Sequence, residues 1–282
     1  MKTAIIDIGG GLRDIYGAGV LDRLLDENVS VDYCLGISAG SANLMMYTSR
    51  QRGLSYRYYT EFAFRSKYMS PRNYLTVGSL MNLDYIYGEI PSSNGEAPMD
   101  YETFISSPTE YHIGVLNAND GQPVYFSKHD IPKDDYTILK ASSALPRYSK
   151  AYQIGSMTCY DGGLADPIPL NKALADGCDR IVLILTKPKD DIRHYDDQEK
   201  EARYLRKRGY YKAAISTRLK AFKYNQEMEQ ARLLEKQGKL LIIAPDDLCG
   251  VGVVTRDKEK LHALYQKGYE DGIKAGEFLR KQ

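Results

Sequence analysis

Apolar residues follow two alternating patterns along the chain, short runs typical of strands and spacings typical of helices. The segments 3–8 and 31–35 are mostly apolar and are bounded by polar residues or glycines. This pattern predicts strands that are buried in a sheet. Between them the apolar positions have helical spacing, at Val20, Leu21, Leu24 and Leu25. We therefore expect a strand, a helix that ends near Asn28, and a second strand.

The alternation continues downstream and is interrupted by one irregular segment. Residues 54–104 are rich in tyrosine and broken up by prolines and glycines, so we expect an insertion or cap of short helices. Asn119-Asp120-Gly121 joins two apolar runs and predicts a hairpin. The other predicted elements are strands at 112–117 and 123–127, a helix at 134–144 stopped by Pro146, a second hairpin at 151–160, a helix at 171–176, a strand at 180–186, a charged helical region at 195–237, a strand at 240–244 and a helix at 257–279.

Strands that alternate with helices predict an α/β fold with a largely parallel sheet. A chain of 282 residues can bury one sizeable core with an appendage. We expect the core to cover residues 1–186 and to include the insertion at 54–104. Residues 187–282 are expected to form a helical extension with one further strand, packed on the same domain.

Composition excludes several classes of protein. There are 38 Lys and Arg residues against 37 Asp and Glu residues, so we expect no nucleic-acid partner. The four cysteines form no C-x-x-C pair, and no metal-ligand cluster or cofactor motif is visible, so we expect neither a metal nor a cofactor. Residues 1–7 do not resemble a secretory signal, and no apolar stretch is long enough to span a membrane. We expect a soluble, cytoplasmic chain.

One short motif carries most of the chemical information. Gly36-Ile37-Ser38-Ala39-Gly40 follows the second predicted strand and precedes a predicted helix at 41–50. This is the context in which G-x-S-x-G forms a nucleophile elbow, with the serine exposed at the start of a helix. Backbone N–H groups at that position favour negative charge that develops on a substrate oxygen. Ser38 is therefore the candidate nucleophile.

A serine needs a base that accepts its proton, and the residues leave more than one candidate. His194 or His262 could complete a Ser-His-Asp triad, although both lie among charged residues that indicate a solvated helix face. Asp161, in Asp161-Gly162-Gly163, reads from spacing alone as a turn residue. It could act as a base only if a partly desolvated site raised its pKa from the usual value of about 3.9.

Three motifs together resemble those of the patatin-like phospholipase family. They are, in order, Gly9-Gly10-Gly11-Leu12-Arg13, the elbow around Ser38, and Asp161-Gly162-Gly163. The similarity extends over residues 2–186, and the tail at 244–272 looks like that of bacterial cytoplasmic members. It implies a three-layer α/β/α fold and cleavage of lipid acyl esters by a serine–aspartate dyad without histidine.

The resemblance also assigns roles to single residues. It implies that Ser38 is the nucleophile and Asp161 the base, and that the amides of Gly10 and Gly11, helped by Arg13, form an oxyanion hole. The chain departs from the family at Asp14, where a glycine is expected. Aspartate is a good helix N-cap and tolerates left-handed backbone, so we expect the turn to survive.

Other functions fit the same residues less well. Dinucleotide binding would need Gly or Ala at the position of Asp14, and the second strand ends in the elbow instead of an acidic residue. A non-catalytic lipid-binding or regulatory module of the same fold is an alternative that an ester-hydrolysis assay separates from an enzyme. We expect a serine lipid acyl hydrolase, of phospholipase A or lysophospholipase type.

The segment 200–223 suggests how such a chain reaches a lipid. It holds nine Lys or Arg residues and one acid, interleaved with aromatic and aliphatic residues. A basic helix of this kind can lie on an anionic membrane surface. A solvated helix that packs its apolar stripe on the core is the competing interpretation.

Overall fold

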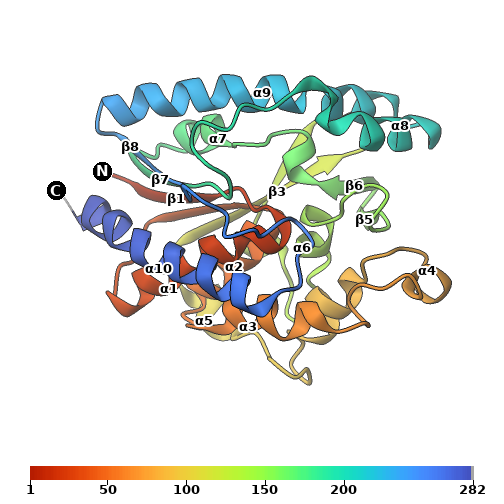
Figure 1. Cartoon of the computed structure of the whole chain (residues 1–282), viewed down its shortest axis with the longest axis horizontal. Helices are drawn as coiled ribbons and strands as arrows, with labels where there is room; N and C mark the ends of the chain where they lie inside the picture. The colour runs from red at the N-terminus through yellow and green to blue at the C-terminus, as the bar shows by residue number, and fades with distance from the viewer. Residues whose placement is uncertain (281–282) are drawn as a thin grey trace.

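The computed structural model describes residues 1–280 and is built around one central sheet (Figure 1). Within that range the sheet has eight strands, seven of them in the order β5-β6-β3-β2-β1-β7-β8 and the eighth, β4, paired with β3. The pairs β1–β2, β1–β7, β2–β3 and β7–β8 are parallel, which makes the sheet mostly parallel. The strands are β1 Thr3–Asp7, β2 Tyr33–Ile37, β3 Glu110–Asn117, β4 Pro123–Ser127, β5 Tyr152–Ile154, β6 Met157–Asp161, β7 Arg180–Ile184 and β8 Leu240–Ile243.

Helices cover both faces of the sheet and make the fold a three-layer α/β/α sandwich (Figure 1). On one face lie α7 (Leu170–Ala175) and α9 (Tyr211–Lys236), with α8 (Glu199–Lys207) beside α9. On the other lie α1 (Ile15–Asp26), α2 (Ala39–Thr48) and α10 (Lys258–Arg280). The predicted α/β class and the three layers are confirmed.

The strands are buried on both faces, as the apolar runs predict. Along β1, Ala4 and Ile6 enter the core beneath α7 and α9, whereas Ile5 enters the core beneath α1, α2 and α10. Side chains of successive strand residues point to opposite faces, so a strand between two helical layers must be apolar at nearly every position. The central strands therefore carry no periodicity of two.

Residues 54–104 form short helical pieces and loops beside α2 (Figure 1). The helices are α3 (Leu54–Thr60), α4 (Asn73–Thr76) and α5 (Tyr101–Ser106), with single helical turns at Phe62–Phe64 and Tyr85–Glu89. Several of its tyrosines, among them Tyr58, Tyr59, Tyr68 and Tyr85, are buried. The segment thus adds an aromatic flank to the core on that face of the sheet.

One predicted helix begins later than expected, and one predicted helical region is confirmed but divided. The helix expected at 134–144 is α6, Thr137–Ser142, because Asp134 has a left-handed φ of 63° and the side chain of Asp135 accepts the backbone N–H of Thr137. The helical region expected at 195–237 is divided into a turn at Tyr195–Gln198, α8 and α9. Gly209, with φ of 84°, ends α8 in the manner of a helix C-terminal glycine.

None of the helices in residues 1–280 is long and apolar enough to cross a membrane.

Candidate active site

The register of the sheet brings the ends of two distant strands together. β4 occupies one edge of β3, so β2 and β6 share the other edge. Ile37, the last residue of β2, pairs with Gly114, and Asp161, the last residue of β6, pairs with the next residue, Val115. Because β2 is parallel and β6 antiparallel to β3, their ends point toward one another. Ser38 therefore stands next to Asp161, although 123 positions separate them in the sequence.

Ser38 has the backbone of a nucleophile elbow. Its φ of 55° and ψ of −131° lie in a region that costs a non-glycine residue on the order of 1–3 kcal/mol. Gly36 and Gly40 make the turn possible, because a Cβ at Gly36 would lie 2.3 Å from Cα of Ser41 and one at Gly40 would lie 2.4 Å from the Asp7 carbonyl oxygen. The glycines of the motif are thus a steric requirement of strand and helix meeting this closely.

A second serine holds the elbow in place. Ser142, at the end of α6, accepts the backbone N–H of Ser38 at 2.9 Å and donates to the carbonyl of Gly114 at 2.8 Å. It is fully buried. Ser142 thus ties the strained turn to β3, the strand that also aligns Asp161.

Asp161 is buried, and opposing effects act on the pKa of its carboxyl group. Its Oδ1 accepts the backbone N–H of Gly163 at 2.9 Å. Burial raises the pKa of the carboxyl group above its usual value, while the positive charge of Lys220, the Ser38 side chain and the Gly163 amide act in the opposite direction. Burial is the largest of these effects, and a raised pKa is what a carboxylate needs to act as a base. Gly162 belongs to the same turn, where a Cβ would lie 2.3 Å from the Gly114 carbonyl oxygen.

The glycine run after β1 forms a loop over the same cavity. Gly9, Gly10 and Gly11 all have positive φ, at 68°, 155° and 61°. A Cβ at Gly10 would lie 2.2 Å from Oγ1 of Thr186, which itself donates to the Gly9 carbonyl at 2.7 Å. In the described residues, neither the Gly10 nor the Gly11 N–H donates to a protein acceptor. Both amides are therefore available to a substrate oxygen.

Arg13 lies half-buried at the same cavity. Its Nε lies 3.4 Å from the Gly10 carbonyl oxygen, at the long limit for a hydrogen bond. Burial lowers the pKa of the guanidinium, and the nearby charge of Arg193 adds to that effect. The side chain thus braces the glycine loop and brings a positive charge to the site.

Asp14 does not cap α1 with its side chain, contrary to the expectation from sequence. It stands at the N-cap position, but its carboxyl group turns inward and meets Asp7, and both residues are fully buried. Oδ1 of Asp7 accepts the Gly9 N–H at 3.1 Å, whereas Oδ2 of Asp7 and both oxygens of Asp14 are buried without a hydrogen-bond partner. Burial raises the pKa of Asp7 to about 6 and that of Asp14 well above its usual range. Burial and the mutual repulsion of the two carboxylates therefore favour a proton on this pair.

Ser38 and Asp161 open into a polar cavity of about 210 Å³. Besides the predicted site residues, its lining contains two cations that sequence analysis missed, Arg193 and Lys220. Lys220 comes from α9 and is half-buried. A Cβ at Gly163 would lie 3.7 Å from Nζ of Lys220 and 3.2 Å from Oδ1 of Asp161. The distance between Nζ of Lys220 and Oδ1 of Asp161 therefore cannot exceed the sum of these two distances.

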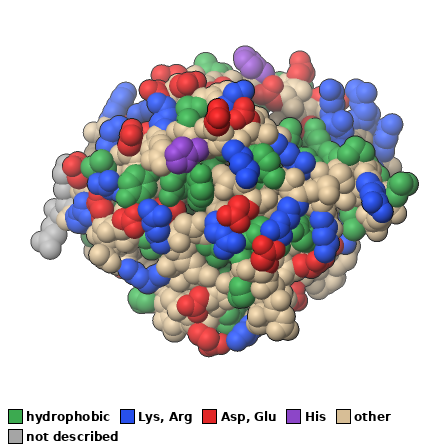
Figure 2. All heavy atoms as spheres, turned by 60° about the horizontal axis from the view of Figure 1, so that its bottom comes forward, with side chains coloured by type: hydrophobic (Ala, Val, Ile, Leu, Met, Phe, Trp, Pro, Cys, Tyr) green, Lys and Arg blue, Asp and Glu red, His purple; other side chains and the backbone are tan. Residues whose placement is uncertain are grey.

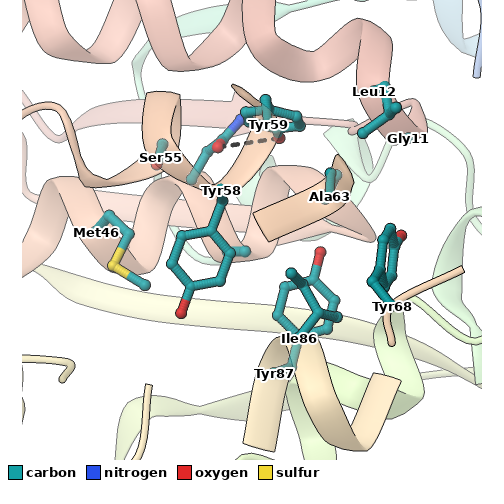
Figure 3. Close-up of a pocket in the computed structure, with 13 residues that line it drawn as sticks. Gly11, Leu12, Met46, Ser55, Tyr58, Tyr59, Ala63, Tyr68, Ile86 and Tyr87 are labelled. Carbon is teal, nitrogen blue, oxygen red and sulfur yellow. Dashed lines mark hydrogen bonds between the residues drawn. The ribbon is translucent and has the colours of Figure 1, made fainter. Parts of the chain in front are cut away.

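A second, apolar cavity lies between α2 and the segment 54–104 (Figure 3). It has a volume of about 40 Å³, room for roughly three water molecules. Figure 3 shows Tyr58 beside Met46 of α2, Tyr68 on the opposite side and Tyr87 between them. Ala39, next to Ser38, and Gly11 also line it. Gly11 lines both cavities, so the glycine loop separates them.

None of the four histidines lines the cavity that contains Ser38. His194 and His262 are exposed, and Nδ1 of His262 lies 3.0 Å from the Tyr56 hydroxyl. His112 stacks on Tyr33 at the far end of β2 and β3. Within residues 1–280 no group of three metal-ligating side chains is close enough to hold a metal ion. The ionisable side chains that line this cavity are therefore those of Arg13, Arg193 and Lys220, of Asp161 and Asp197, and of Tyr224.

The fold and site together are those of an α/β protein with a serine elbow and a facing aspartate. The family described as patatin-like phospholipase matches residues 9–174, and the chain belongs to this family. The description of the family is that of a lipid hydrolase. A second family, described as a domain of unknown function (DUF6363), matches residues 214–281.

Individual relatives extend the comparison. The chain is 27% identical over 192 residues to the uncharacterized protein YjjU of Escherichia coli K12. The aligned region covers 66% of this chain and 52% of YjjU. The chain thus spans about half the length of this relative. Among solved structures it is similar to VipD from Legionella pneumophila, with a TM-score of 0.49 and 12% identity over 98% of this chain and 67% of VipD.

Proposed function

We propose that the chain is a serine lipid acyl hydrolase that cleaves carboxylic esters through a Ser38–Asp161 dyad. The observation that carries the proposal is the junction of β2 and β6, which sets the strained serine against a buried aspartate with a raised pKa. Unpartnered amides of Gly10 and Gly11 border the same cavity. Its location in the cytoplasm stays a prediction from sequence.

The reaction follows from these positions. Oγ of Ser38 attacks the ester carbonyl carbon while its proton passes to the carboxylate of Asp161. The amides of Gly10 and Gly11 donate to the oxyanion, and Arg13 adds positive charge beside it. The intermediate collapses, the leaving alcohol takes the proton from Asp161, and an acyl-serine remains. A water that gives its proton to Asp161 then attacks the acyl-serine, and the proton passes from Asp161 to Oγ of Ser38 as the fatty acid leaves.

The two cavities suggest where the parts of the substrate bind. The tyrosine-lined cavity lies on the α2 side of the elbow and suits an acyl chain. The cavity lined by Arg13, Arg193 and Lys220 suits a polar leaving group. Because the apolar cavity is narrow, a long acyl chain requires displacement of side chains from the segment 54–104.

Substitution of the dyad tests the proposal. Ser38→Ala and Asp161→Asn should each lower kcat/KM for a fatty-acyl ester by about three orders of magnitude or more, because each removes one half of the proton transfer. In the unsubstituted chain kcat/KM should fall as pH decreases through the raised pKa of Asp161, since only the carboxylate accepts the proton. Released fatty acid measured by mass spectrometry reads out both effects.

The control is the double variant His194→Ala/His262→Ala, which should retain activity. A double variant as inactive as Ser38→Ala would refute the dyad in favour of a histidine triad. Activity that persists unchanged in Ser38→Ala would refute the serine mechanism altogether.

We also propose that α8 and α9 contact an anionic membrane surface. An apolar stripe is exposed along one side of α9, formed by Tyr211, Ile215, Leu219 and Phe222. Exposed cations flank it, among them Arg203, Arg206, Lys207, Arg208 and Lys212. Figure 2 shows Lys and Arg side chains gathered at the upper right, toward the side on which α8 lies in Figure 1. Each cation of this kind adds about 1 kcal/mol to binding of an anionic surface.

Vesicle co-sedimentation tests this contact. The chain should pellet with vesicles that contain phosphatidylserine at low salt and less at high salt. Changing Arg206, Lys207 and Arg208 to Glu should abolish pelleting, and Phe222→Ser should weaken it. Binding that neither salt nor these substitutions affect would show that the face is only solvated.

A further inference from the structure

Two cations in the polar cavity have no salt-bridge partner. Within residues 1–280 neither Arg13 nor Lys220 makes a salt bridge, although both line the cavity beside Ser38. Both are partly buried, and burial lowers the pKa of each. A buried, unpaired cation is unfavourable by itself, so a cavity that holds two of them favours an anion between them.

The other charged groups near the cavity are already engaged. Arg193 pairs with Asp191 at 3.2 Å and lies over the ring of Tyr224. Asp197 accepts the backbone N–H of His194 at 3.2 Å and is exposed. Glu201, whose charge reaches Lys220, pairs with Arg147 at 3.1 Å. Asp161 and Asp197 are the carboxylates among the lining residues, and Asp161 influences Lys220 through its charge without forming a salt bridge with it.

We propose that Arg13 and Lys220 form an anion subsite that binds a phosphomonoester on the leaving-group side of the substrate. The inference rests on the proposed function, because it takes Ser38 as the point of attack. A guanidinium offers a planar fork of donors and an ammonium a compact charge, and both are suited to phosphate oxygens. A zwitterionic head group would place its own cation among Arg13, Arg193 and Lys220, so the subsite selects lipids with a terminal, uncovered phosphate.

The position of Lys220 in the fold explains why it serves this site. On α9, Leu219 and Phe222 face outward, whereas Ala221 and Tyr224 are buried against the core. Lys220 lies between these two faces and reaches the cavity from the edge of the helix. The residue lies outside the segment 9–174 that matches the patatin-like family and inside the segment 214–281. The C-terminal region therefore contributes substrate preference to a site whose reacting groups come from the core.

Binding to the inactive Ser38→Ala chain tests the subsite without any hydrolysis. The probes are dodecyl phosphate below its micelle concentration, dodecyl maltoside as the neutral counterpart, and inorganic phosphate, each titrated by calorimetry. We expect dodecyl phosphate to bind most tightly, and Lys220→Met in this background to weaken it about tenfold to a hundredfold, as for a lost charge-assisted hydrogen bond. Lys236→Met, at the exposed C-terminal end of the same helix, is the matched control and should change nothing.

Two results of that titration overturn the inference. Dodecyl phosphate that binds Lys220→Met as well as it binds the parent shows that Lys220 is not part of a subsite. Inorganic phosphate that binds as tightly as dodecyl phosphate shows that the cavity takes free phosphate and not a lipid.

Hydrolysis gives a second readout that a merely structural role would not move. The ratio of kcat/KM for a 1-acylglycerol 3-phosphate to that for the corresponding monoacylglycerol should fall about tenfold or more in Lys220→Met and be largely retained in Lys220→Arg. An equal loss on both esters would refute the subsite. If neither ester is hydrolysed while dodecyl phosphate binding still depends on Lys220, the hydrolase proposal fails and the subsite stands.

Discussion

The two cavities near Ser38 differ in almost every respect. The polar cavity is bordered by loops at the carboxyl ends of β1, β2 and β7, by the end of β6 and by α9, and it contains the charged side chains. The apolar cavity lies between α2 and the tyrosine-rich segment 54–104, and no Lys, Arg, Asp or Glu lines it. The glycine loop at Gly11 belongs to both. In the proposed function, one loop would therefore donate its amides to a reacting oxygen and would also lie between a hydrophobic tail and an ionic head.

Substitution of the shared loop should have the largest effect. In Gly11→Ala the new Cβ would lie 2.7 Å from the Val253 carbonyl oxygen, at a φ of 61° that alanine rarely adopts. The amide would move, and loss of one oxyanion donor lowers kcat by about 10²–10³. Steady-state kinetics on a short and a long acyl ester should show equal losses, since the loop serves both.

Gly177→Ala is the matched control, because Gly177 also has a positive φ but has open space around it. It should cost about 1 kcal/mol of stability and leave kcat unchanged. If Gly11→Ala behaves like this control, the loop is not part of the oxyanion hole.

Filling the apolar cavity should separate its role from that of the polar one. Ala42 lies one helical turn after Ser38 and lines only the apolar cavity. Ala42→Phe should lower kcat/KM for a hexadecanoyl ester about tenfold relative to an acetyl ester, because lost apolar contacts discriminate by about 1–3 kcal/mol. Equal changes on the two esters would place the acyl chain elsewhere.

The smallest effect concerns the proton that is favoured on the pair of Asp7 and Asp14. Their pKa values are raised in the folded chain, to about 6 for Asp7 and well above the usual range for Asp14, so the folded state holds protons that the unfolded state releases. The free energy of unfolding should therefore fall as pH rises from about 4 through 6 and beyond. In Asp14→Asn an uncharged amide replaces the carboxyl group that binds the proton. The decrease in the free energy of unfolding between pH 5 and pH 8 should then be smaller by about 1 kcal/mol or more.

Urea unfolding at the two pH values measures that difference. Parallel pH dependences in the parent chain and Asp14→Asn would show that the pair does not hold this proton. A kcat that is unchanged at pH 8 would add that the pair supports the fold and not the reaction.

Sequence analysis predicted those parts of the site that impose a local steric rule. Gly36 and Gly40 could be predicted from the sequence because no side chain fits where Ser41 and Asp7 approach them. Asp161 became readable only through its resemblance to a family motif, since an aspartate before two glycines is ordinary in a turn. The dyad itself awaits experiment, although the structure brings the two residues together.

The rest of the site could not be predicted from the sequence, because it depends on contacts between residues that are distant along the chain. Lys220 lies in a run of charged residues in which most cations are exposed, and its direction depends on how α9 packs against the sheet. Asp14 was expected to cap a helix because isolated sequence shows the N-cap position but not the partner, Asp7, that lies across the buried space. The predicted start of the helix at 134 failed for a similar reason, since the left-handed backbone of Asp134 follows from contacts such as that with Ser93.

The order of the strands has a consequence for when the site exists during synthesis. β1 lies in the middle of the sheet, between β2 and β7, and α1 packs against α10. A ribosome that has made Ser38, or even Asp161, has therefore not yet made β7 and β8, which complete the sheet, or α9 and α10, which cover its two faces. Thr186, Lys220 and Val253, which border the cavity, also follow Asp161 in the sequence. Nascent chains should thus be inert toward lipid until nearly the whole described chain has left the exit tunnel.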